Sequence, residues 1–310
     1  MTQDNQTNGA SSSSSSLTQW GDKERQDWFQ KQVIKRSYQD EVVSKIKTLT
    51  DKFEIIQYGS LSCNPEQYPL FAIKSLNWDA NKPTILVTGG VHGYETSGVH
   101  GALGFAEQKA LQYPHYNFVI TPCISPWGYE TINRWNNLAI DPNRSFYQNS
   151  PAEESANLMA FIQSLNTEFL MHIDLHETTD TDNQIFLPAL AARDGVKPTI
   201  WEIPDGFYVV GDAENPADEF QKAIIQSVEN VTHIAPSDNN NRIIGEPVSQ
   251  HGVINYMAQK LFLCMGFTGA KYCSTTEVYP DSPKVTPQEC IDAQIAAVIG
   301  GLNYLDSLNS

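Results

Sequence analysis

The stretch Thr84-Ile-Leu-Val-Thr-Gly-Gly-Val-His-Gly-Tyr-Glu95 decides the fold. Its opening run, residues 84–88, is continuously apolar between two threonines, as expected of a strand that is covered on both faces. Two glycines end this run, and a helix is predicted over residues 96–111. A buried strand followed by a glycine-containing turn and a helix is typical of parallel β-α-β units, whose functional loops follow the carboxyl ends of the strands.

The same alternation continues along the chain. It predicts one α/β domain over residues 18–310, with a mixed, mostly parallel central sheet and helices on both faces. The segment 178–255 carries the weakest pattern. Apolar runs predict strands at 53–59, 68–75, 84–88, 116–122, 169–175, 208–210, 243–244, 262–265 and 272–278, and apolar periodicity predicts helices at 23–49, 96–111, 152–165, 217–231 and 286–305.

Composition excludes several classes of function. A net charge of −16 argues against sequence-blind binding to nucleic acid, which needs a basic surface. No apolar run reaches the ~20 residues that a transmembrane helix requires, so no membrane partner is expected. Residues 1–17 include six consecutive serines and are expected to be a disordered tail. They lack the basic and apolar regions of a secretory signal, which predicts a cytoplasmic protein. The sequence leaves the oligomeric state open.

Metal-binding residue types occur at the ends of two predicted strands. His92 and Glu95 lie three residues apart after the strand at 84–88, and His176 lies at the end of the strand at 169–175. Imidazole nitrogen and carboxylate oxygen are zinc ligands, and a catalytic zinc site uses three protein ligands. These three residues are therefore the candidate ligands. His172 is a rival to His176, because residues 172, 174 and 176 share one face of a strand.

Each of these residues also has an ordinary structural explanation. Glu95 at the start of a helix is favoured by the helix dipole, and His176 alone is compatible with a hydrogen-bonded core histidine. Asp174 is either the hydrogen-bond partner of a ligand imidazole or an inward carboxylate that is paired elsewhere.

The order of the motifs resembles the zinc carboxypeptidase superfamily: His-x-x-Glu, then an Asn-Arg pair, a strand-terminal His and a late Glu. The short interval between Glu95 and His176 is similar to that of the succinylglutamate desuccinylase/aspartoacylase branch and of small bacterial carboxypeptidases. The resemblance covers roughly residues 50–305 and implies a zinc carboxypeptidase-like fold. It also implies one Zn²⁺ per chain, held by His92, Glu95 and His176.

The resemblance also implies roles for four further residues. Asn143 and Arg144, in Asp141-Pro-Asn-Arg144, would bind the substrate carboxylate, for which a guanidinium offers two charge-assisted hydrogen bonds. Glu277 would be the general base. Arg134 would stabilise the oxyanion, although Arg134-Trp135 reverses the family's usual order and leaves a structural role as the alternative.

Together these roles describe a zinc-dependent hydrolase that cleaves an amide bond next to a carboxylate. The first hypothesis is a metallocarboxypeptidase that removes C-terminal residues from peptides. The second is a deacylase of N-acyl amino acids, and the third is a non-catalytic relative that keeps the fold and the metal. The length of the pocket behind Arg144 separates the first two hypotheses. The position of Glu277 relative to the metal ligands tests the third.

Overall fold

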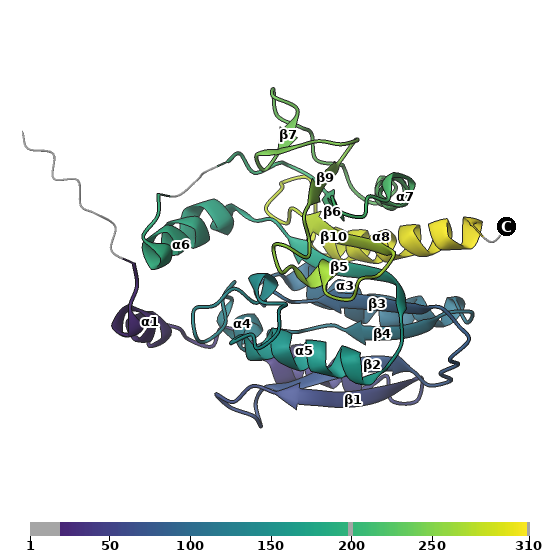
Figure 1. The fold of residues 1–310 in the computed structure, drawn as a ribbon, viewed down its shortest axis with the longest axis horizontal. Helices are drawn as coiled ribbons and strands as arrows, with labels where there is room; N and C mark the ends of the chain where they lie inside the picture. Colours follow the sequence, from purple (N-terminus) through teal and green to yellow (C-terminus); the bar gives the residue numbers. More distant parts are fainter. Residues whose placement is uncertain (1–18, 198–200, 309–310) are drawn as a thin grey trace, which may run out of the picture.

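The computed structural model describes residues 19–197 and 201–308. Its centre is an eight-stranded sheet with the order β1-β2-β4-β3-β5-β10-β6-β9 (Figure 1). The central pairs β4–β3, β3–β5 and β5–β10 are parallel, as is β6–β9, and the remaining pairs are antiparallel. The strands of this sheet are β1 (Phe53–Ser60), β2 (Pro69–Ser75), β3 (Thr84–Gly89), β4 (Asn117–Thr121), β5 (Phe169–Glu177), β6 (Tyr208–Asp212), β9 (Val253–Tyr256) and β10 (Tyr272–Val278).

Helices cover both faces of this sheet, which confirms the predicted fold class. On one face, α3 (Thr96–Gln108), α7 (Asp218–Val228) and α8 (Pro287–Ser307) share a core with β3, β4 and β5. On the other face, α5 (Glu153–Ser164) packs in a second core (Figure 1). The remaining elements are α1 (Asp22–Phe29), η1 (Gln39–Val43), α2 (Ser44–Lys47), η2 (Ala110–Gln112), α4 (Pro126–Thr131), η3 (Pro142–Arg144), η4 (Asp182–Phe186), α6 (Leu187–Asp194), η5 (Cys264–Gly266) and the hairpin β7 (Arg242–Ile243) and β8 (Glu246–Pro247).

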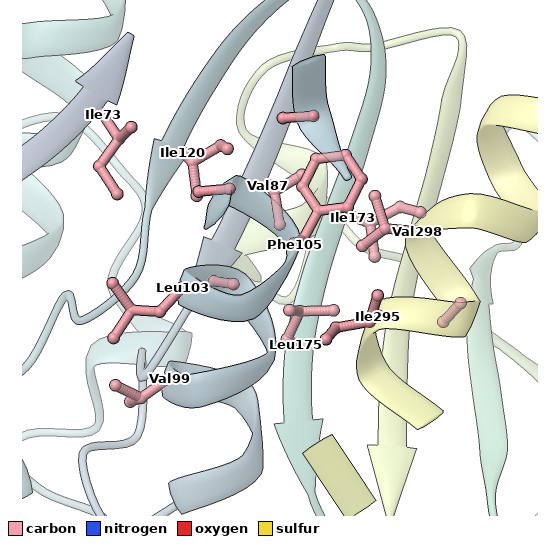
Figure 2. Packing of buried hydrophobic residues seen from close by; sticks show 14 of the residues in the cluster. Ile73, Val87, Val99, Leu103, Phe105, Ile120, Ile173, Leu175, Ile295 and Val298 are labelled. Carbon is pink, nitrogen blue, oxygen red and sulfur yellow. The ribbon is translucent and has the colours of Figure 1, made fainter. Parts of the chain in front are cut away.

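The buried strand β3 shows why both faces are covered. Ile85 and Val87 belong to the α3/α8 core, whereas Leu86 belongs to the α5 core. Figure 2 shows Val87 and Ile173 beside Phe105 of α3 and Val298 of α8. Because adjacent residues of a strand point to opposite faces, an uninterrupted apolar run needs an apolar partner on each side. This double burial fixes the central strands, and their carboxyl ends form one edge.

Two predicted elements are wrong. The helix predicted over residues 23–49 is divided into α1, η1 and α2, because the backbone N–H groups of Lys35 and Arg36 donate to the carbonyl of Glu130 instead of continuing a helix. The strand predicted at 262–265 is a loop that leads into η5. Its Cys264 N–H donates to Asn143 Oδ1 at 2.8 Å, so residues 263–265 are buried without joining the sheet, while Phe262 is exposed.

The predicted serine-rich tail lies outside the described residues. Within the described parts of the chain, none of the helices combines the length and apolar character needed to span a bilayer. The cysteines are free, four of them buried and Cys63 exposed.

Candidate metal centre and active site

The turn after β3 brings His92 and Glu95 to the carboxyl edge of the sheet. This turn packs closely on α4. A Cβ atom at Gly93 would lie 2.1 Å from the backbone nitrogen of Tyr129, so only glycine fits there. Arg36 holds the same turn from the N-terminal segment. Its guanidinium donates to the carbonyl of Gly93 at 2.8 Å and to Thr96 Oγ1 at 2.6 Å. Packing and hydrogen bonds within the protein therefore fix this turn without the help of a bound ligand.

The three candidate ligands His92, Glu95 and His176 meet at this edge, with ligand atoms within 4.8 Å of one another. Each side chain is at most 2% exposed. His92 Nδ1 lies 2.8 Å from Glu95 Oε1, and His176 Nδ1 lies 2.8 Å from Glu95 Oε2. The rival His172 lies elsewhere, fully buried beside Thr88. The structure thus brings His176, and not His172, to the other two residues.

The hydrogen-bond partners of the two imidazoles fit a cation between them. His92 Nε2 contacts Asp141 Oδ1 at 2.9 Å, and His176 Nε2 contacts Asp174 Oδ2 at 2.7 Å. Each imidazole therefore has a carboxylate at both nitrogens, although a neutral imidazole carries only one N–H. If the Nε2 atoms carry the hydrogens, both Nδ1 lone pairs face Glu95. Among the described residues, no group donates a well-aligned hydrogen bond to the buried Glu95 Oε2.

This donor set suits a divalent metal ion. Two imidazole nitrogens and one carboxylate are a common catalytic zinc set, and the carboxylates behind the imidazoles orient such ligands. Burial opposes ionisation of Glu95, but the imidazoles of His176 and His92 outweigh it and lower the pKa of Glu95 to about 2. The carboxylate is thus ionised, as a metal ligand must be.

Arg134 lies between two carboxylates beside this centre. Its Nε is 3.1 Å from Asp141 Oδ2, and its Nη1 is 3.4 Å from Asp182 Oδ1. Although burial disfavours the charge of Arg134, Asp141 and its other acidic neighbours raise the pKa of the guanidinium well above the ordinary value. Arg134 is therefore a permanent cation that lines the cavity, held in place by paired acids.

Asn143 and Arg144 diverge from one short turn. The Asn143 side chain is buried and tied to the backbone of Cys264. Arg144 is exposed and lines the cavity, and its Nη1 donates to the carbonyl of Asn143 at 2.8 Å. Asn143 also lines the cavity, with its Nδ2 3.5 Å from His176 Nε2, and its role in binding the substrate carboxylate stays a prediction, while Arg144 presents a cation to the cavity.

Glu277 lies beside His176 because β10 and β5 are parallel neighbours in which these two residues are paired. Its Oε2 accepts a hydrogen bond from Thr178 Oγ1 at 2.8 Å. Burial raises the pKa of Glu277 to about 8, with His176 opposing the shift and Glu95 adding to it. A carboxyl group with a pKa near neutrality suits proton transfer.

All seven residues that the sequence singled out line one cavity of about 610 Å³. Its lining also includes Trp135, Leu190 and Trp201. Arg25 of α1 and Arg193 of α6 also line it, and we call the part of the lining formed by α1 and α6 the outer wall. This volume lies within the ~300–1,000 Å³ range of pockets that bind small molecules.

Sequence analysis missed three residues that organise the site. Asp141 bonds both His92 and Arg134, Asp182 accepts from the hydroxyl of Tyr94, and Thr178 bonds Glu277. Their only signal is position: Thr178 and Asp182 directly follow the strand end that carries His176, and Asp141 opens the Asp-Pro-Asn-Arg segment.

A family model, the succinylglutamate desuccinylase/aspartoacylase catalytic domain, matches residues 81–195. This segment contains the three candidate ligands and the Asp-Pro-Asn-Arg segment, but not Glu277. No curated protein matches the sequence.

Solved structures resemble the chain over most of its length. A protein from Shewanella amazonensis SB2B, provisionally assigned as a metallopeptidase, has a TM-score of 0.65 and 19% identity, covering 85% of this chain and 91% of its own. A metallo-carboxypeptidase from Burkholderia cenocepacia has a TM-score of 0.59 and 15% identity, with 86% and 68% covered. Carboxypeptidase A from Helicoverpa armigera has a TM-score of 0.58 and 14% identity, with 89% and 74% covered. These likenesses establish the fold.

Proposed function

Because the chain resembles the zinc carboxypeptidase superfamily near its succinylglutamate desuccinylase/aspartoacylase branch, we propose that it is a zinc-dependent hydrolase of amide bonds adjacent to a carboxylate. The observation that carries this proposal is the shared cavity. Candidate metal ligands, a carboxyl group of raised pKa and an accessible guanidinium all line it. Hydrolysis next to a carboxylate needs these three functions within reach of one substrate.

His92, Glu95 and His176 would hold one Zn²⁺ through two imidazole nitrogens and a carboxylate. When bound there, the ion supplies Lewis acidity, which polarises a carbonyl group and acidifies water. Glu277 accepts a proton from the attacking water and passes it to the leaving amine. Thr178 holds the Glu277 carboxyl group in place for this transfer.

The two accessible cations have separate tasks. Arg144 binds the substrate carboxylate, because its planar guanidinium matches a carboxylate and its Nη1 is bonded only to a backbone carbonyl among the described residues. Arg134 lies on the Asp141 side of the cluster and offsets the negative charge that develops on the scissile carbonyl oxygen. Its two paired acids restrict its motion, which favours positioning over mobility.

The form of the cavity favours a peptide substrate. Its lining includes Trp135, Leu190 and Trp201, which offer apolar surface for residues that precede the scissile bond. We therefore place a metallocarboxypeptidase that trims C-terminal residues first. The match of residues 81–195 to the desuccinylase/aspartoacylase model favours the second candidate, a deacylase of N-acyl amino acids. The register that sets Glu277 beside His176 argues against a non-catalytic relative. A cytoplasmic location stays a prediction from the sequence.

One experiment separates these candidates. Zinc-loaded protein is assayed for release of C-terminal amino acids from a mixed peptide library, and in parallel for hydrolysis of N-acetyl- and N-succinyl-amino acids. Glu277→Gln is the catalytic control, because it keeps the shape of the side chain and removes the base. Peptide trimming that depends on Glu277 supports the carboxypeptidase. Activity confined to acyl amino acids supports the deacylase, and zinc-dependent hydrolysis that is unchanged in Glu277→Gln contradicts the mechanism.

A further inference from the structure

A line of buried polar side chains continues from the candidate ligand His176 into the core. Asp174 Oδ2 lies 2.7 Å from His176 Nε2, and Asp174 Oδ1 accepts a hydrogen bond from Thr88 Oγ1 at 2.6 Å. Thr88 Oγ1 in turn lies 3.0 Å from His172 Nε2. The four side chains are at most 1% exposed. The pairing of Thr88 with Asp174 across β3 and β5 places them on one face of the sheet.

The chemistry of these groups determines which one donates and which one accepts in each hydrogen bond. An ionised carboxylate only accepts, so Asp174 takes one hydrogen from His176 Nε2 and one from the Thr88 hydroxyl. The hydroxyl has a single hydrogen, so its two lone pairs are left to accept, one from the Cys264 thiol at 3.6 Å and one from His172 Nε2–H. His172 Nδ1 is left to accept from Thr268 Oγ1, which lies 3.4 Å away. Burial lowers the pKa of His172 to about 4, so His172 is neutral and carries one N–H.

We propose that Thr88 and His172 are positioning residues of the metal site, acting through Asp174 to place the imidazole hydrogen of His176 on Nε2. Nδ1 then presents its lone pair toward Glu95, where the metal is bound. This inference rests on the proposed function. It also assigns a task to His172, the histidine that competes with His176 on sequence grounds.

The line constrains His176 more than a single carboxylate would. With both oxygens bonded, Asp174 has no freedom to rotate away from the imidazole. Without the Thr88 hydroxyl, Asp174 Oδ1 would lose the donor that lies 2.6 Å from it, and the carboxylate would be free to rotate toward its other neighbour, the Cys264 thiol. This rotation weakens the hold on His176 Nε2, and hence the metal affinity.

The neighbouring strand offers a matched control. Thr121 on β4 is paired with Thr88 on β3, is equally buried, and its hydroxyl has no hydrogen-bond partner among the described residues. Thr88→Val and Thr121→Val therefore make the same chemical change at adjacent sites of the sheet. Thr88→Ser keeps the hydroxyl and tests whether the loss of the methyl group matters.

The test measures the Zn²⁺ dissociation constant of each full-length variant by competition with a chelator, together with the melting temperature of the metal-free protein. Loss of a group that orients a metal ligand weakens metal binding by ~10–100-fold, so we expect about a tenfold loss in Thr88→Val. Thr88→Ser and Thr121→Val should bind Zn²⁺ like the unaltered protein. Equal affinity of Thr88→Val and Thr121→Val, or an equal loss in Thr88→Val and Thr88→Ser, would overturn the inference.

A second measurement needs no variant and so does not depend on whether Thr88→Val folds. Nitrogen-15 NMR of the zinc-loaded protein reports which ring nitrogen of each histidine carries hydrogen. We expect His172 in the Nε2–H form. The backbone of Met265 offers His172 a competing partner, and an Nδ1–H form bonded there would overturn the inference. If the unaltered protein binds no Zn²⁺ at all, the proposed function itself fails, which is a different outcome from equal affinities.

Discussion

The two sides of the cavity are built in different ways. On the inner side, His92, Glu95 and His176 are almost completely buried, and each imidazole lies between two carboxylates. On the outer side, the described helix α1 contributes no buried residue and α6 contributes only Ala191. Buried polar groups hold their geometry because every alternative leaves a partner unsatisfied, whereas half-exposed side chains can move at little cost. The inner side is thus suited to the chemistry and the outer side to the choice of substrate.

If this division is correct, Glu95→Gln has the largest effect. The variant keeps the shape but removes the charge that faces both Nδ1 atoms, so metal affinity collapses and hydrolysis falls to background. Metal content and kcat/KM measure the effect. Glu154→Gln, the same change at another buried glutamate outside the cavity, is the control and should retain both. A Glu95→Gln protein with full metal content and activity would contradict the assignment of the chemistry to the inner side.

Arg144→Ala is expected to act on substrate binding. A hydrogen bond to a charged group is worth ~1.5–3 kcal/mol, so kcat/KM should fall by about 10–100-fold, mainly through KM. Arg144→Lys restores the charge without the planar fork and should recover part of the loss. The kinetics of a substrate whose carboxylate is converted to an amide provide the check. That substrate should distinguish poorly between the variants, and a full Arg144 effect on it would refute the assigned role.

The pH dependence of kcat/KM gives a further test of the inner side of the cavity. Burial raises the pKa of Glu277 from 4.5 to about 8, and a group below its pKa is protonated and unable to act as a base. We therefore expect kcat/KM to rise with pH through a limb above the ordinary glutamate range, and a bound cation to move that limb downward. The profile is measured at saturating Zn²⁺. A flat profile between about pH 5 and 8 would contradict Glu277 as the base.

The outer wall should give smaller and substrate-dependent effects. Leu190→Ala removes part of an apolar side chain that lines the cavity on α6. Partial loss of apolar contact predicts changes of about tenfold or less in KM, which differ among peptides, with kcat nearly constant. A comparison of kcat and KM over a peptide series tests this. A uniform fall in kcat would show that the wall takes part in the chemistry.

Glu154 should affect stability and not activity. Burial raises its pKa from 4.5 to about 7, and its buried Oε1 has no hydrogen-bond partner within the described parts of the chain. The folded state holds the proton more tightly, so stability is highest below pH 4.5 and falls as the pH rises toward 7. At ~1.4 kcal/mol per pH unit, Glu154→Gln should gain about 3 kcal/mol of unfolding free energy above pH 7. Urea unfolding at several pH values tests this, and a pH-independent difference would contradict it.

The residues of the inner side could be predicted from the sequence because each of them lies at or close to the end of a predicted strand. A buried strand must end at the edge of the sheet, and parallel strands bring His92, His176 and Glu277 to the same edge. The alternation of side chains along a strand did not distinguish His172 from His176, because both lie on one face of β5. Only the position along the strand distinguishes them: one lies within the core and the other at its end.

The mispredicted segments fail for a physical reason of the same kind. Tyr38 is fully buried in the core with its hydroxyl donating to the carbonyl of Pro69, and Trp28 packs on Trp127. Their spacing imitates one helix, but Lys35 and Arg36, which lie between them, donate to the carbonyl of Glu130 and interrupt it. Cys264 is apolar and buried, yet its backbone N–H donates to the Asn143 side chain and not to a neighbouring strand. Burial is visible in a sequence, but the partner that causes it is not.

The central claim is a metal bound at the end of β3 and β5, and X-ray absorption at the zinc edge tests it most directly. The account predicts about one equivalent of zinc in metal-replete protein, with two imidazole ligands and carboxylate oxygen. His176→Ala should lose one imidazole from the spectrum or lose the zinc, whereas His172→Ala should keep both imidazoles at weaker affinity. Protein that retains no zinc, or a spectrum in which His172→Ala and not His176→Ala removes an imidazole, would contradict the account.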